Sequence, residues 1–252
     1  MKRVMVKIAA AFTAAVLCAS AAPVQVLAGP SGEVQKTVEV PATKPYSGDI
    51  NKLEAAKDAP QMIVIISNPE DPARGNLSWY RRDPSGRLVS VMNEVCVTGM
   101  NGVVSPEEKQ EGDMKTPSGL YHFSGAYGLK MNPGSKLPYH QFVSGDYWVD
   151  DPESTNYNKL VNTSSVTKDW KSAEDLMNAG ICYDFILAID YNKEAVPGKG
   201  SAIFLHCPKA FNNTGTSGCI SISEEQMEVL LKNVTDKTKV LIVKSEEELA
   251  NY

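Results

Sequence analysis

Residues 201–207, which read SAIFLHC, form a short and mostly apolar run that predicts a strand. Because successive strand residues alternate between faces, Ala202, Phe204 and His206 fall on one face and Ile203, Leu205 and Cys207 on the other. Both faces are mostly apolar, which is typical of a strand buried on both sides. Pro208 lacks a backbone N–H and ends the pairing. The pattern therefore places His206 at the last position of a rigid strand.

A loop is predicted at residues 211–218, which are rich in Asn, Thr, Ser and Gly, as turns are. Cys219–Ile222 is a short apolar run. Ser223 and Gln226 have the spacing of a capping box, and the apolar residues at positions 227, 230, 231 and 234 predict one helical stripe. Cys219 is therefore expected between a loop and a strand–helix junction.

Other apolar runs predict six more strands and one more short helix. The strands cover Met62–Ile66, Leu77–Arg81, Leu88–Val97, Gly119–Phe123, Cys182–Asp190 and Thr238–Val243, and the helix covers Ser172–Asn178. Residues 126–160 are dense in Gly, Pro, Tyr and Asn without a clean period, and long irregular segments of this kind are often functional lids. Many short strands, turns between them and two short helices predict a mainly β fold, a two-sheet β-sandwich.

The first 28 residues have the pattern of a secretory signal peptide. Basic residues precede an apolar run, and Val26-Leu27-Ala28 fits the pattern of a signal-peptide cleavage site, with alanine last. The run is short for a membrane span, although a retained signal-anchor is the alternative. Cys18 follows Leu17, where a lipidated cysteine needs a small residue, so no stable membrane anchor is expected. The chain is predicted to be exported across the cytoplasmic membrane, to the cell wall, the periplasm or the extracellular space.

The remainder divides into three parts by composition. Residues 29–59 are rich in Pro, Lys, Glu and Thr and predict a flexible linker. Residues 60–244 predict one folded domain of ordinary size, and residues 245–252 predict a frayed tail. The net charge of −5 and the lack of a basic stripe argue against a nucleic-acid partner. No oligomeric state follows from the sequence.

Four cysteines follow the signal: Cys96, Cys182, Cys207 and Cys219. An even number in an oxidising compartment allows disulfides, but four in a chain of this length do not make a disulfide scaffold. Cys96 and Cys182 lie in apolar runs and are expected to be core thiols. No paired Cys-x-x-Cys or His-x-x-x-His spacing accompanies them, so neither a metal nor another cofactor is predicted.

His206 and Cys219 together suggest covalent catalysis. A free thiol has a pKa of about 8.5 and needs a base such as imidazole to take its proton near neutral pH. The small residues Ser217 and Gly218 allow a substrate carbonyl to approach, and the amides around Gly218 and Cys219 are candidate oxyanion donors. A buried core histidine and an inert thiol are the alternative. A strand-end histidine, then a Gly/Ser/Thr loop, then Gly-Cys favours catalysis.

This segment resembles the active-site signature of the L,D-transpeptidase (YkuD-type) family, a strand histidine followed by a loop and Ser/Thr-x-Gly-Cys. Here it reads His206 and then TSGCI at residues 216–220. The likeness extends to GDMKTPSGLY at residues 112–121, to Tyr191-Asn192 and to residues 198–203, and covers roughly residues 61–244. The chain differs from many members in having Thr-Ser-Gly-Cys instead of Ser-His-Gly-Cys, Cys207 after the histidine and Ser221 two residues after the cysteine.

The resemblance implies a β-sandwich enzyme that acts on peptidoglycan peptide stems, in cell-wall biogenesis and cell shape. Cys219 is the implied nucleophile, His206 the proton donor and acceptor, and the backbone carbonyl of Cys207 the group that orients the imidazole. The implied product is a 3→3 cross-link formed through a thioester. No sequence feature separates this reaction from hydrolysis by an L,D-carboxypeptidase, and a non-catalytic wall-binding protein is a third possibility.

Four residues are candidate substrate contacts. Thr216 and Ser217 belong to the signature loop, next to the nucleophile. Trp148 and Tyr157 lie in the irregular segment beside hydrogen-bonding residues, a combination that suits an amide-rich glycopeptide. The alternative for these two aromatic residues is that they pack the segment onto the domain.

Overall fold

The computed structural model describes residues 44–208 and 214–252. The predicted signal peptide and residues 29–43 of the predicted linker lie outside the described residues, as do residues 209–213 of the loop between His206 and Cys219. No helix within these two described stretches combines the length and the apolar character needed to cross a membrane.

The described residues are mainly strands. The strands are β1 (Gln61–Asn68), β2 (Asp71–Arg82), β3 (Leu88–Val97), β4 (Val103–Val104), β5 (Thr116–Pro117), β6 (Gly119–Gly128), β7 (Tyr139–Gln141), β8 (Asp146–Val149), β9 (Leu160–Asn162), β10 (Ala173–Asp175), β11 (Ile186–Ile189), β12 (Phe204–His206), β13 (Ile220–Ser221) and β14 (Lys239–Val243). The helices are α1 (Glu224–Leu231) and the 3₁₀ helices η1 (Ile50–Lys52), η2 (Glu54–Ala56), η3 (Ile181–Tyr183) and η4 (Glu246–Asn251). The prediction of a mainly β fold is confirmed.

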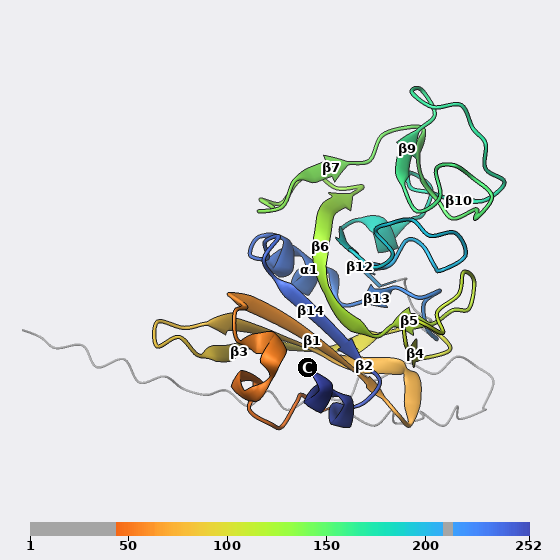
Figure 1. Ribbon diagram of the computed structural model, residues 1–252. Helices are drawn as coiled ribbons and strands as arrows, with labels where there is room; N and C mark the ends of the chain where they lie inside the picture. The colour runs from red at the N-terminus through yellow and green to blue at the C-terminus, as the bar shows by residue number, and fades with distance from the viewer. Residues whose placement is uncertain (1–43, 209–213) are drawn as a thin grey trace, which may run out of the picture. The chain divides into compact units, whose positions relative to one another are not determined.

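The main sheet is a closed ring and not the two-sheet sandwich expected from the sequence. Its strands run in the order β11-β12-β13-β3-β2-β1-β14-β6, and β6 pairs again with β11. The long strand β6 makes this closure possible (Figure 1). Residues 119–122 of β6 pair with β14, and residues 123–127 pair with β11. β6 therefore pairs with both β14 and β11, whereas in a two-sheet sandwich these two strands would belong to separate sheets.

Apolar residues line both sides of the ring. In β1, Ile63 and Ile65 belong to the cluster inside the ring, whereas Met62 and Val64 belong to a cluster on its outer face. Trp79 and Tyr80 divide between the same two clusters, because successive strand residues point to opposite faces.

The predicted linker is folded over its last part. Ile50, Leu53 and Ala59 are at most 7% exposed and pack on the outer face of β1, β2 and β14. Backbone carbonyls of this segment accept hydrogen bonds from the side chains of Arg82 and Lys239. Burial of its apolar residues offsets the conformational entropy that this Pro- and Lys-rich segment loses when it folds.

The predicted tail is folded as well. Residues 246–251 form η4, and Leu249 is 1% exposed within the same outer cluster. The amide of Ala55 donates to the carbonyl of Tyr252 at 2.5 Å. The N-terminal 3₁₀ helices and η4 lie side by side on one face of the ring (Figure 1).

The segment expected to be an irregular lid contains a small sheet of its own, in the order β10-β8-β9. The predicted helix at Ser172–Asn178 is wrong, because Ala173–Asp175 pairs antiparallel with β8. Of its apolar residues, Leu176 is fully buried but Met177 is 41% exposed, which does not fit a helical stripe. The predicted strand Cys182–Asp190 starts later, since η3 occupies residues 181–183.

Helix α1 forms where the apolar stripe predicts it, with Met227, Leu230 and Leu231 buried in the ring cluster. Ser223 is its N-cap residue but makes no side-chain capping hydrogen bond. Burial of the stripe, and not the capping box, therefore accounts for the helix.

Candidate active site

His206 and Cys219 lie on neighbouring strands. His206 ends β12, and Cys219 immediately precedes β13, which pairs parallel to β12 with His206 opposite Ser221. Because side chains alternate along a strand, Cys219 and Ser221 share a face, and Cys219 is a diagonal neighbour of His206. Phe204 and Cys219 belong to one cluster outside the ring, whereas Leu205 belongs to the interior cluster, as the alternation of residues 201–207 predicts.

The imidazole of His206 has a fixed orientation. Its Nδ1 lies 2.5 Å from the carbonyl oxygen of Cys207, the contact expected from the resemblance. A carbonyl oxygen only accepts hydrogen bonds, so Nδ1 carries the hydrogen, and Nε2 is the nitrogen that can take up a proton. The ring of Tyr183 packs against the imidazole with centroids 5.7 Å apart at 74°. His206 itself is 6% exposed, so its position is set by the strand and by these two neighbours.

The sulfur of Cys219 is held as a thiol. The residue is 8% exposed, and Sγ donates to the carbonyl oxygen of Ala202 at 3.1 Å. Burial raises the pKa of the Cys219 thiol to about 12, and the carboxylate of Glu174 adds to the rise. A base is therefore needed to form the thiolate near neutral pH.

Two glycines and a threonine shape the turn before the nucleophile. At Gly218, with φ of +141°, a Cβ would lie 2.9 Å from the carbonyl oxygen of Lys115, so a side chain does not fit. Gly215 lies against the backbone of Met100, where a Cβ would lie 2.4 Å from its Cα. Thr216 Oγ1 donates to the Cys219 carbonyl at 2.6 Å, which closes the turn.

One candidate oxyanion donor is already engaged. The amide of Gly218 donates to Thr216 Oγ1 at 3.1 Å, so it is not available to a substrate in this structure. The role of Gly218 as an oxyanion donor stays a prediction, and it would require this amide to exchange Thr216 Oγ1 for the substrate. Of the two amides that the sequence pointed to, that of Cys219 remains.

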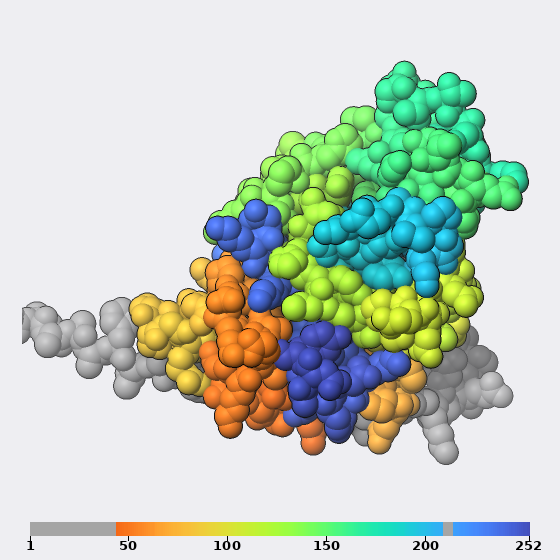
Figure 2. All heavy atoms as spheres, in the orientation of Figure 1, coloured from red at the N-terminus to blue at the C-terminus, as the bar shows by residue number. Residues whose placement is uncertain are grey.

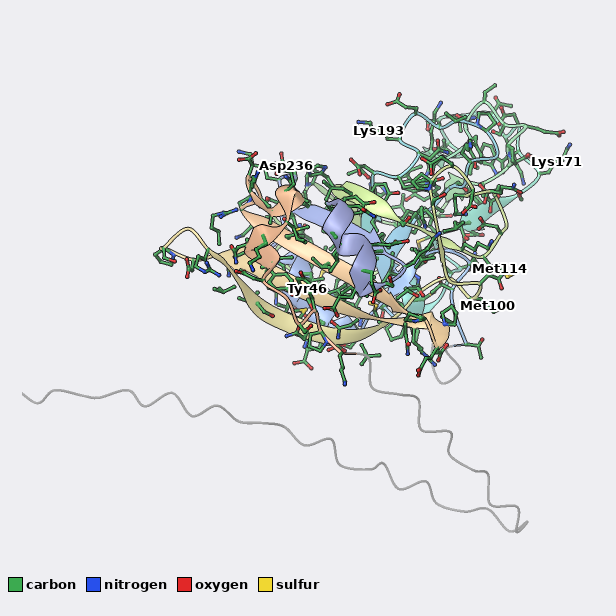
Figure 3. The ribbon with its side chains drawn as sticks, turned by 60° about the horizontal axis from the view of Figure 1, so that its bottom comes forward. Tyr46, Met100, Met114, Lys171, Lys193 and Asp236 are labelled. Carbon is green, nitrogen blue, oxygen red and sulfur yellow. The ribbon has the colours of Figure 1, made fainter. Side chains whose placement is uncertain are left out.

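A cavity of about 500 Å³ opens beside the two residues. Its described lining residues are Met100, Glu111, Gly112, Met114, Asp150, Glu174, Ala179, Cys182, Tyr183, Ser201, Ala202, Ile203, His206, Gly215, Thr216, Ser217 and Cys219. The structure thus brings His206, Thr216, Ser217 and Cys219 to one cavity. Met100 and Met114, which are 46% and 43% exposed, lie on the same side of the molecule (Figure 3).

The two aromatic residues predicted to touch substrate, Trp148 and Tyr157, both make contacts within the protein. Neither is among the described lining residues of the cavity. Tyr157 is 2% exposed; its hydroxyl donates to Glu111 Oε2 at 2.5 Å and accepts from the amide of Gly200 at 3.0 Å. Trp148 packs edge-on against Phe204 with centroids 4.8 Å apart. The Tyr157 hydroxyl and the Trp148 ring thus both have partners within the protein, as the packing alternative predicts.

Asn158 is the residue that the sequence reasoning missed. Its Oδ1 accepts from Trp148 Nε1 at 2.9 Å and from the amide of Ala202 at 3.1 Å, and its Nδ2 donates to the carbonyl of Asn192. Ala202 has φ of +50°, an uncommon conformation for a residue with a side chain, and its carbonyl holds the Cys219 thiol. Asn158 therefore fixes the backbone on which the sulfur rests. In the sequence, the one feature that could have pointed to Asn158 is its position directly after Tyr157.

The other described thiols are also buried, and of the three only Cys182 lines the cavity among the described residues. Cys96, Cys182 and Cys207 are buried and, like Cys219, unbridged. Burial raises the pKa of Cys96 and of Cys207 to about 12 in each case. The Cys207 side chain belongs to the cluster inside the ring, so only its carbonyl reaches the site.

Comparisons with solved structures found distant similarities. The helical cell shape determining protein Pgp2 from Campylobacter jejuni is 18% identical, with 75% of this chain and 52% of that chain covered and a TM-score of 0.37. A variant of the Enterococcus faecium L,D-transpeptidase is 14% identical, with 72% and 49% covered and a TM-score of 0.33. Mycobacterium tuberculosis L,D-transpeptidase 1 is 12% identical, with 73% and 62% covered and a TM-score of 0.30. The chain spans about half the length of the first two.

A comparison with curated protein sequences found no match. The family model of the YkuD L,D-transpeptidase catalytic domain matches residues 63–242, which is more than half of the 252 residues. That match runs from β1 to β14 and includes every strand of the closed ring and the cavity beside His206 and Cys219. The chain therefore belongs to the L,D-transpeptidase catalytic domain (YkuD) family.

Proposed function

We propose that this chain is an exported cysteine acyltransferase that acts on the peptide stems of peptidoglycan and forms 3→3 cross-links. One observation carries the proposal: His206 and Cys219 line the same cavity, with Nδ1 of the imidazole held by the Cys207 carbonyl. Membership of the family supports the substrate class. A role in cell-wall biogenesis and cell shape follows from that activity.

The first half-reaction transfers an acyl group to sulfur. As Sγ of Cys219 attacks the carbonyl between the third and fourth stem residues, the thiol proton passes to Nε2 of His206. The S–C bond forms, the C–N bond breaks, and His206 returns the proton to the leaving amine of the terminal D-alanine. The amide of Cys219 is the donor that we assign to the developing oxyanion. The product is a thioester on Cys219.

The second half-reaction depends on the acceptor. An amine from a second stem attacks the thioester, loses a proton to His206 and gives the cross-link, while sulfur recovers its proton. Water in the same position would release a tripeptide, which is the L,D-carboxypeptidase reaction. Burial raises the pKa of the Cys219 thiol, so little thiolate exists beforehand, and His206 is the base that we assign to remove the proton for attack.

The test is incubation of the purified protein with tetrapeptide muropeptides, followed by separation of the products. Cross-linked dimer with released D-alanine is expected. Tripeptide alone would identify a carboxypeptidase. Full activity in Cys219→Ala would contradict the assignment of the nucleophile, and an inert wild-type protein would leave a wall-binding role.

A further inference from the structure

Lys109 carries a charge that is buried close to the reactive pair but outside the cavity. The residue is 2% exposed and is not among the described lining residues. Its Nζ donates to Asp113 Oδ1 at 2.8 Å and to the carbonyl oxygen of Gln110 at 2.7 Å. The two side chains of the ion pair are 2% and 14% exposed, and no other ion pair between described residues has both side chains buried to this extent. Buried ion pairs add little net stability, so the position of this one needs another reason.

Asp113 uses the same carboxylate to close the turn before β5. Its Oδ1 also accepts from the amide of Lys115 at 2.8 Å, and its Oδ2 accepts from the amide of Gln110 at 2.9 Å. Met114, between the bonded residues, has φ of +58°, a conformation that persists where neighbouring contacts hold it. Burial raises the pKa of Asp113, but the hydrogen bonds from Lys109 and the two amides outweigh burial and hold that pKa below its usual range.

The turn that Asp113 closes packs against the residues that present the sulfur. The carbonyl oxygen of Lys115 is the atom that a Cβ at Gly218 would meet at 2.9 Å. Thr116 Oγ1 donates to the carbonyl oxygen of Cys219 at 3.4 Å. A shift of this turn would therefore move the backbone of Cys219.

The same lysine contacts the segment on which the sulfur rests. A Cβ at Gly200, which has φ of +99°, would lie 3.1 Å from Lys109 Nζ, so this glycine allows the ammonium to approach the backbone closely. Two residues further on, the carbonyl oxygen of Ala202 accepts the hydrogen bond from Cys219 Sγ. Lys109 therefore contacts a second segment that supports the sulfur.

The two segments, residues 110–116 and 198–202, also contact each other. The amide of Glu111 donates to the carbonyl oxygen of Gly198 at 2.9 Å. Figure 2 shows them side by side, the first in yellow-green and the second in light blue. The ion pair lies where these segments meet.

Lys109 also acts on the sulfur through its charge. Burial raises the pKa of the Cys219 thiol to about 12, whereas the positive charge of Lys109 opposes the rise. The described residues that line the cavity include neither Lys nor Arg, so this cation acts on the sulfur without lining the cavity.

We propose that Lys109 and Asp113 are positioning residues for Cys219, because their buried ion pair joins the two segments that hold the sulfur beside His206. The inference rests on the proposed function, in which Cys219 is the nucleophile. Among the described residues, neither member of the pair lines the cavity, so both act through Cys219 and not on the substrate.

The experiment removes both charges and keeps the approximate shape of the pair. Lys109→Met/Asp113→Asn leaves no unpaired buried charge and should remain folded, as a urea midpoint measures. For D-alanine release from a tetrapeptide stem, kcat should fall by about 10- to 100-fold, whereas KM should change by less than about threefold, because the sulfur and not the substrate contacts are displaced. Lys232→Met/Glu228→Gln removes an exposed ion pair of the same i,i+4 spacing; this matched control should retain the wild-type kcat.

Alkylation of Cys219 by iodoacetamide, followed by mass spectrometry, is a second readout that needs no peptide substrate. Loss of the Lys109 charge should raise the pKa of the thiol, slow alkylation at pH 8 by about two- to fivefold and move the rate profile to higher pH. A pair that served stability alone would lower the urea midpoint without moving this profile.

A wild-type kcat together with an unchanged alkylation profile in the folded double variant would overturn the inference and leave the proposed function intact. Failure of the wild-type protein to release D-alanine, with slower alkylation in the double variant, would instead overturn the proposed function and support the positioning role. If the double variant does not fold, Asp113→Asn, which keeps an oxygen acceptor for the Lys115 amide, replaces it. The same loss of kcat is expected there, and a wild-type kcat would contradict the inference.

Discussion

Two outer faces of the same ring are built differently. The sealed face, over β1, β2 and β14, is covered by η1, η2 and η4 through an almost wholly apolar cluster. The open face, over β11, β12 and β13, carries the cavity, the two reactive side chains and three carboxylates. Apolar burial is sufficient to close a face, whereas a reactive cavity needs polar groups that only hydrogen bonds can position.

Backbone conformation follows the same division. The described non-glycine residues with positive φ are Met114, Asn158, Asn192, Ala195 and Ala202, and none lies in the helices of the sealed face. Such conformations cost roughly 1–3 kcal/mol each and persist where neighbouring contacts hold them. Asn192 Nδ2, for example, donates to the carbonyl of Gly200 at 2.8 Å. Two of these residues, Met114 and Ala202, line the cavity of the open face.

The largest expected effect is a loss of stability at the sealed face. Leu249→Ala removes a side chain that is 1% exposed and should lower the free energy of unfolding by about 2–5 kcal/mol. The acylation rate of the folded protein should not change, because the residue is remote from the cavity. Urea denaturation and thiol acylation measure the two quantities. Val89→Ala, at a side chain 41% exposed, is the control and should leave both unchanged.

Gly218→Ala should mainly lower the rate at which Cys219 is acylated. The added Cβ would meet the Lys115 carbonyl and move the turn that presents Cys219, so acylation is expected to slow by about 100-fold, the cost of a displacement near 1 Å. Gly86→Ala is matched in sign of φ, at +85°, but a Cβ there meets nothing within 4 Å. Gly86→Ala should lower the free energy of unfolding slightly and leave the acylation rate unchanged. An equal loss of rate in both variants would remove the distinction between the two faces.

Asn158→Ala should weaken the support of Ala202. Loss of the bond to the Ala202 amide lets the carbonyl that holds the thiol shift, so acylation should slow by about tenfold, with about 1–3 kcal/mol lost from stability. Asn156→Ala is the neighbouring control, since Asn156 Nδ2 reaches Asp169 at 3.3 Å and not Ala202. A normal acylation rate in Asn158→Ala would show that Ala202 is held by other contacts.

The smallest expected effect concerns the charge of Glu174. Its carboxylate raises the pKa of Cys219, so Glu174→Gln should lower that pKa and increase the thiolate fraction at any pH below about 12. Alkylation by iodoacetamide at pH 8 should then be about two- to fivefold faster, and the rate should rise about tenfold per pH unit in both proteins. A slower reaction in the variant would reverse the sign assigned to Glu174.

Local patterns predicted the parts of the site that lie in strands. The period of two over residues 201–207 correctly separated Ala202 and Phe204 from Ile203, Leu205 and Cys207, because it fixes which face each residue takes. The turn before Cys219 was recognised from its Gly and Thr content. The ring closure was not, because pairing of β6 with β11 joins residues about 60 positions apart and leaves no local signal.

What else the sequence did not reveal has physical causes of the same kind. The substrate contact predicted for Tyr157 stays a prediction, and its sequence neighbours do not reveal that its hydroxyl is shared between Glu111 and Gly200, partners from distant segments. Ile50 and Leu53 lie in a stretch whose composition is typical of disorder, and they are buried by contact with β1, β2, β14 and the C-terminal end of the chain. The composition of a segment indicates whether the segment can fold by itself, but not which other segments bury its apolar residues.

The central claim, that His206 activates Cys219 in a shared cavity, is tested most directly by acylation with a carbapenem-like acyl donor, followed by mass-spectrometric mapping of the adduct. The account predicts one adduct on Cys219 in the wild-type protein, none in Cys219→Ala, and a rate roughly 100- to 10,000-fold lower in folded His206→Ala. An adduct on Cys96, Cys182 or Cys207, or an unchanged rate in His206→Ala, would contradict it.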